Sequence, residues 1–118
     1  LNLSDPPTVI CFGNDRMAVR AYGILRSRGL SLPEDISVAG YDNYRLITET
    51  LYPTLTSVEL SYGAIGIRAT QLLLGLIDET MTAPKDPLLI SGPVHHGMSV
   101  RIQPQPITQI SSLGRKSI

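Results

Sequence analysis

The sequence predicts an α/β protein with a parallel, Rossmann-like sheet. Two observations predict it. The first is the order of segments, in which an apolar run is followed by a segment with helical spacing and then by a second apolar run. The second is that the loops between these segments are short. A strand–helix–strand order of this kind forms a right-handed crossover with two parallel strands. The length of 118 residues suits about one domain.

The first strand is predicted at residues 8–12, a continuous β-branched and apolar run that ends at Gly13. A strand without polar alternation is typical of a parallel sheet, in which both faces are buried. Cys11 lies in the middle of this run, so we expect it to be a small core residue rather than a nucleophile.

A helix is predicted to follow, because Asn14 and Asp15 can each accept a hydrogen bond from the amides of a first helical turn. Basic residues and then Gly29 mark its end. Its apolar positions recur with helical spacing; they are Met17, Ala18, Ala21, Tyr22, Ile24 and Leu25.

The next elements are shorter. A second strand is predicted at residues 36–41, followed directly by Asp42 and Asn43. Residues 44–52 predict one or two helical turns, which a proline ends. Residues 55–58 predict a third strand.

A long helix is predicted at residues 62–77, capped by Ser61, because its apolar residues recur every three or four positions. Its three glycines each weaken it by roughly 1 kcal/mol relative to alanine and indicate either close packing or a near approach of the backbone to another group. Two further strands are predicted at residues 88–90 and 98–102. Residues 103–118 lack periodicity and are predicted to be a mobile tail.

Composition excludes several classes of protein. Ten basic residues balance ten acidic ones, and 42% of residues are hydrophobic, which excludes a disordered charged tail and weighs against a nucleic-acid module. The longest apolar run has six residues, too short for a membrane span, and a single cysteine cannot form an internal disulfide. Because the chain begins with leucine and shows no signal peptide, we expect a segment of a longer protein.

Polar side chains follow both predicted parallel strands. Asn14–Asp15 follows the first strand and Asp42–Asn43 the second, and ligands of open parallel sheets bind at these carboxyl ends. Carboxylates and amides suit a hydroxyl-rich ligand such as a sugar or nucleoside, whereas no glycine-rich phosphate cradle is present. The alternative stays open that these residues are only helix caps and turn residues.

No pattern predicts an enzyme, a metal site or a cofactor. His95 and His96 are adjacent, so on a strand they point to opposite faces and cannot form a one-faced metal pair. There is no GxSxG motif and no pair assigned as general acid and base. The helix after Asp15 carries four arginines. Because the chain as a whole is neutral, we expect them to form a solvated or subunit-facing surface rather than a nucleic-acid contact.

Four ordered motifs together resemble the LacI/GalR family of bacterial transcription regulators. They are VICFGNDRMA at residues 9–18, GLSLPEDISVAGYDN at 29–43, PTLTSV at 53–58 and GIRA at 66–69 with Leu73. The resemblance implies a periplasmic-binding-protein-like core of two lobes with an effector cleft between them. It also implies a cytoplasmic homodimer that reaches operator DNA through a headpiece absent from this chain, with effector binding shifting operator affinity allosterically.

The resemblance divides the chain and assigns residues. It implies that residues 1–58 are part of the C-terminal lobe, and that residues 59–102 contain the crossover, a helix of the first lobe and the returning strands. It further implies that Asp42 and Asn14 contact the effector, that Asp15 is structural, and that the first helix and residues 46–52 form the dimer surface.

The sequence departs from the family at two places. Leu60 stands where some members have a glutamine that faces the cleft, which indicates a different effector. The late strand at residues 93–100 lacks the family arginine. The alternative function is a sugar-binding protein of a transport system, which has the same fold and would carry a signal peptide.

Overall fold

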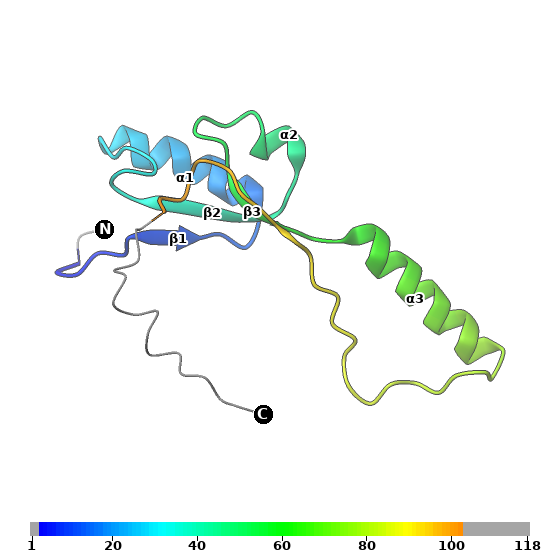
Figure 1. The fold of residues 1–118 in the computed structure, drawn as a ribbon. Helices are drawn as coiled ribbons and strands as arrows, with labels where there is room; N and C mark the ends of the chain where they lie inside the picture. The colour runs from blue at the N-terminus through cyan, green and yellow to red at the C-terminus, as the bar shows by residue number, and fades with distance from the viewer. Residues whose placement is uncertain (1–2, 103–118) are drawn as a thin grey trace, which may run out of the picture.

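The computed structural model describes residues 3–102 of the chain, and it has the predicted α/β order (Figure 1). The elements are β1 (Val9–Cys11), α1 (Asp15–Ser27), β2 (Ser37–Asp42), α2 (Arg45–Thr48), β3 (Thr56–Glu59), α3 (Tyr62–Ile77) and β4 (Val94–His95). The predicted tail at residues 103–118 lies outside the described residues.

The four strands form one open sheet in the order β1-β2-β3-β4. β1 pairs with β2 in parallel, which confirms the predicted direction of these two strands, and β2 also pairs with β3 in parallel. β4 pairs with β3 in the antiparallel direction, with Val58 opposite Val94, so the sheet is mostly rather than wholly parallel.

β1 corrects one expectation. Val9 is 45% exposed and Cys11 is also exposed, although the apolar run predicted a strand buried on both faces. Val9 and Cys11 point to one face of this edge strand, and no helix of residues 3–102 covers that face, whereas Ile10 on the other face packs against the core. The prediction that Cys11 is a core residue is therefore wrong for the described part of the chain.

The hydrophobic core lies between α1 and the sheet. α1 supplies four of its buried apolar side chains, while Met17 and Ile24 of the predicted stripe remain more than half exposed. α1 ends as predicted, and Gly29 has the left-handed φ of 78° that favours glycine after a helix. The core residues are Ala18, Ala21, Tyr22, Leu25, Leu32, Ile36, Val38 and Leu55.

The short elements between β2 and α3 fall close to their predicted positions. α2 is a single helical turn within the segment predicted to hold one or two. β3 begins one residue later than predicted, because the Leu55 amide donates to the Thr48 carbonyl instead of to a neighbouring strand.

α3 has the predicted bounds but lies apart from the sheet, as Figure 1 shows. Of its sixteen residues only Gly75 is buried, and Met81 of the following loop covers it. A Cβ atom at Gly63 or Gly66 would meet nothing within 4 Å, so close packing is found at one of the three helix glycines. Ser61 precedes the helix without a side-chain capping bond, which corrects its predicted role.

The segment after α3 forms β4 rather than the two predicted strands, since neither residues 88–90 nor residues 98–102 form a strand. Ser99 attaches this segment to the sheet through side-chain hydrogen bonds instead of strand pairing. Its hydroxyl donates to the Val38 carbonyl over 2.6 Å and accepts from the Thr56 amide over 2.9 Å, so one side chain joins β2 to β3. Within residues 3–102, no helix has the length and apolar character needed to cross a membrane.

Candidate ligand site at the carboxyl edge of the sheet

The residues that follow β1 and β2 meet at one edge of the sheet. Asp15 begins α1 just after β1, and Asp42 is the last residue of β2. The Tyr44 amide donates to Asp15 Oδ2 over 2.7 Å, so the two strand ends are in direct contact. The predicted convergence of the two polar pairs is therefore confirmed.

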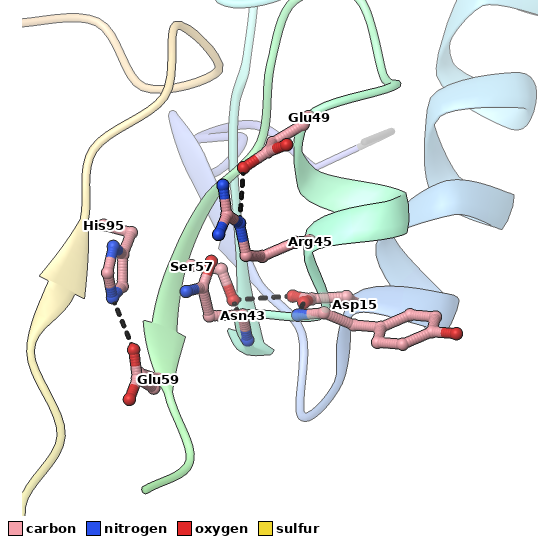
Figure 2. Close-up of polar contacts among 8 residues, drawn as sticks. Asp15, Asn43, Arg45, Glu49, Ser57, Glu59 and His95 are labelled. Atoms are coloured by element: carbon pink, nitrogen blue, oxygen red, sulfur yellow. Dashed lines mark hydrogen bonds and ion pairs between the residues drawn. The ribbon is translucent and has the colours of Figure 1, made fainter.

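Asp15 is completely buried and ties two segments to α1. Its Oδ1 accepts from the Ser57 hydroxyl over 2.7 Å, and its Oδ2 accepts from the Tyr44 amide (Figure 2). A buried carboxylate is tolerated when hydrogen bonds satisfy it, and its place in the first turn of a helix adds a favourable dipole. Asp15 is therefore not the cap of α1, which is Asn14, and its two hydrogen bonds give it a structural role.

Asn14 is the cap of α1. Its side-chain oxygen accepts from the Met17 amide over 2.9 Å, and its backbone is extended as an N-cap requires. The side chain is half-buried, and its NH₂ group makes no hydrogen bond within residues 3–102. Capping therefore uses one of its two polar groups.

Asp42 and Asn43 have unusual backbones. Their φ angles are 110° and 50°. Asparagine tolerates the second angle, whereas an aspartate at the first costs of order 1–3 kcal/mol unless its surroundings hold it there. Both side chains are half-buried, and no hydrogen bond within residues 3–102 uses the Asp42 carboxylate. A strained residue with a free acceptor at a strand end is a typical feature of a binding site.

Ser57 is a site residue that the sequence reasoning missed. It is 1% exposed, and its oxygen also accepts from the Asn43 amide over 3.1 Å. The available signal was a hydroxyl in a buried strand beside the strand that ends in Asp42, since such a group must find partners.

A second cluster of polar side chains lies farther along this edge. His95 Nε2 and Glu59 Oε2 are 2.7 Å apart, and on α2 Arg45 pairs with Glu49 over the same distance (Figure 2). A cavity of about 550 Å³ lies among these side chains. The other residues that line it are Asn43, Thr48, Thr54, Leu55, His96 and Gly97. Within residues 3–102, no three metal-ligating side chains come together.

Comparison with known proteins identifies the family. The profile of the periplasmic binding protein-like domain matches residues 1–100. The chain belongs to this family. The match covers both the sheet and α3, so the two regions are parts of one kind of domain.

The curated relatives are transcriptional repressors. The probable HTH-type transcriptional repressor ExuR of Bacillus subtilis is 37% identical over 82 residues, which are 70% of this chain and 24% of the relative. The sucrose operon repressor of Escherichia coli is 36% identical over 87 residues, which are 73% of this chain and 26% of the relative. The chain thus spans about a quarter of the length of the curated relatives that it matches.

A solved structure agrees in fold and class. The LacI family transcriptional regulator from Arthrobacter, in complex with lactose, is 29% identical with a TM-score of 0.67 over 80% of this chain and 35% of that one. The relatives are thus transcriptional repressors and a LacI family regulator, which confirms the resemblance drawn from the four motifs.

Proposed function

We propose that this chain is the C-terminal part of the effector-binding core of a LacI-type repressor, and that Asp42 and Asn14 bind a sugar or a similar hydroxyl-rich effector. The observation that carries the proposal is the Asp42 carboxylate, which stands at the end of β2 without a hydrogen bond within residues 3–102. A carboxylate accepts hydrogen bonds from neighbouring hydroxyls, the groups that a sugar presents in pairs.

The relatives support a sugar as the effector class. One of them is named for the sucrose operon, and a similar solved regulator holds lactose. Leu60, whose amide approaches the Asp42 carbonyl at 3.4 Å, places an apolar side chain where some family members have glutamine. We infer an effector whose surface beside its hydroxyls is apolar, as the ring face of a pyranose is.

The separation of α3 from the sheet supports a division into two lobes. We infer that residues 1–58 belong to one lobe and that residues 59–102 carry the crossover and a helix of the other. In this scheme the full-length protein is a cytoplasmic homodimer that binds operator DNA through a separate headpiece. Effector binding between the lobes then changes the affinity for DNA.

A sugar-binding protein of a transporter has the same fold and is the alternative. The repressor relatives favour the regulator. A helix-turn-helix encoded upstream supports the regulator, whereas a signal peptide there supports the transport protein.

The test measures binding of sucrose, lactose, cellobiose and adenosine to the full-length protein by calorimetry. The sugar that binds is then titrated into the Asp42→Asn variant, which keeps the shape of the side chain and removes its charge. Loss of a charged hydrogen-bond acceptor typically costs about 1.5–3 kcal/mol, so binding is expected to weaken by roughly 10-fold or more.

The control is Asp5→Asn, an exposed carboxylate on the lead-in segment, which is expected to bind as the wild type does. Equal affinity of Asp42→Asn and wild type for the sugar contradicts the assigned role of Asp42. Binding of adenosine in place of every sugar corrects the effector class.

A further inference from the structure

We propose that Asp15 and Ser57 are positioning residues, and that together they hold residues 42–44 in the conformation that presents Asp42 to its effector. We call this pair the Asp15–Ser57 clamp. The expected effect of the clamp on effector binding rests on the proposed function, whereas its effect on the backbone of residues 42–44 does not.

The clamp fixes two successive amides. The Asn43 amide donates to the Ser57 hydroxyl oxygen, and the Tyr44 amide donates to Asp15 Oδ2. The Ser57 hydroxyl in turn donates to Asp15 Oδ1, so both amides depend on one carboxylate, directly or through Ser57. Three segments that are far apart in sequence are joined in this way.

The clamp is protected from solvent. Asp15 is 0% exposed and Ser57 is 1% exposed, so water does not compete for their hydrogen bonds. Gly40 makes the arrangement fit, because a Cβ atom there would collide with Asp15 Oδ1 and lie 2.9 Å from Leu55 Cδ2. A side chain at that position of β2 would displace the carboxylate.

The backbone needs such a clamp. Asp42 and Asn43 both have positive φ, which local sterics disfavour for residues with a Cβ atom. The hydrogen bonds of the two amides directly after Asp42 stabilise this positive-φ conformation. Without them the turn relaxes toward negative φ and the Asp42 carboxylate changes direction.

Ser57→Ala is the variant that tests the clamp, and Ser99→Ala is its matched control. Ser99 is also buried, also donates one hydrogen bond through its hydroxyl and also accepts one from an amide. The two substitutions remove the same atom, and although Ser99 also interacts with Tyr22, it makes no hydrogen bond to residues 42–44. Ser57→Thr keeps the hydroxyl and serves as the rescue.

Two readouts in the full-length protein separate positioning from stability. Amide hydrogen exchange reports the Asn43 and Tyr44 amides without any ligand. Calorimetry with sucrose, lactose and cellobiose reports binding. We expect Ser57→Ala to speed exchange at Tyr44, whose own partner Asp15 is retained, and to weaken binding of the sugar by about 10-fold.

Ser99→Ala is expected to lower the melting temperature as much as Ser57→Ala does while exchange at Tyr44 and sugar affinity stay near wild type. Recovery of both readouts in Ser57→Thr supports the clamp. Exchange at Tyr44 that is no faster in Ser57→Ala than in Ser99→Ala overturns it. If none of the three sugars binds the wild type, the sugar class proposed for the effector is contradicted, and exchange at Tyr44 alone decides the clamp by the same comparison.

Discussion

The sheet with α1 and the helix α3 both carry many apolar side chains, yet they bury them very differently. In the part of the chain that the structure describes, every buried core side chain lies between Ala18 and Leu55, whereas α3 leaves Leu73, Leu74 and Ile77 more than half exposed. An apolar helix that is exposed along its length needs a partner surface to be stable in water. The sheet with α1 therefore carries its own core, whereas α3 depends on contacts beyond residues 3–102.

The largest expected effect distinguishes the two regions by stability. Leu55→Ala removes a side chain that is 2% exposed and should lower the free energy of unfolding by about 2–5 kcal/mol. Leu73→Ala, at a position 58% exposed, should change it by less than about 0.5 kcal/mol. Urea unfolding of the 118-residue chain measures both, and equal losses would contradict the comparison.

A pair of glycine substitutions gives opposite signs. Gly40→Ala drives a methyl group into Asp15 and Leu55 and should destabilise by about 1–3 kcal/mol. Gly66→Ala adds a methyl group where nothing lies within 4 Å and should stabilise α3 by up to about 1 kcal/mol. Melting temperatures of this chain check the signs. In the full-length protein, a loss at Gly66 would show that another segment packs against that face.

The strained strand end gives a smaller effect with a functional cost. Asp42→Gly relieves a φ of 110° and should raise stability by about 1 kcal/mol, since strain of this kind exceeds the entropy cost of glycine. The same variant should lose sugar binding. Asn43→Gly is the comparison, because asparagine tolerates a φ of 50° and little is gained there. A stability loss in Asp42→Gly, measured by urea unfolding, would sink this account of the edge.

The smallest effect is a pH dependence in the core. Burial raises the pKa of Tyr22 above its ordinary value of 10.0, although a hydrogen bond with Ser99 and the charge of Arg26 act in the opposite direction. Because the pKa is higher in the folded state, the stabilisation is complete below pH 10.0 and is lost as pH rises through the raised pKa. Stability should therefore fall above pH 10.0.

Tyr22→Phe is the variant for this prediction. It removes the hydroxyl that donates to the Pro53 carbonyl over 3.0 Å, which should cost about 1 kcal/mol at neutral pH. It should also flatten the alkaline fall, whereas Tyr52→Phe, at a position 77% exposed, should do neither. Urea midpoints across the alkaline range measure this, and an equally steep fall in Tyr22→Phe would assign it to other groups.

The elements that the sequence predicted well are those set by local signals. α1 and α3 follow from helical spacing and α1 from its cap as well, and Asp42 follows from its place after an apolar run. These signals lie within a few residues of the feature that they predict. β2 was also predicted to within one residue at each end, and α2 forms one turn inside the longer segment predicted for it.

The features that sequence reasoning missed depend on distant partners. β1 reads as a buried strand, but burial is decided by what lies on both of its sides. Asn14 and Asp15 are equally good caps chemically, and Asp15 acquires its role only by meeting Ser57, 42 residues later. Ser99 joins two strands through one side chain, which no periodicity reveals.

The central claim is that α3 depends on contacts beyond residues 3–102, whereas the core between α1 and the sheet lies within them. Hydrogen exchange of residues 62–77, measured in the 118-residue chain and in the full-length protein, tests it most directly. We predict that α3 amides exchange much more slowly in the full-length protein, while β2 amides change little between the two. Equal exchange of α3 in both proteins would contradict the claim.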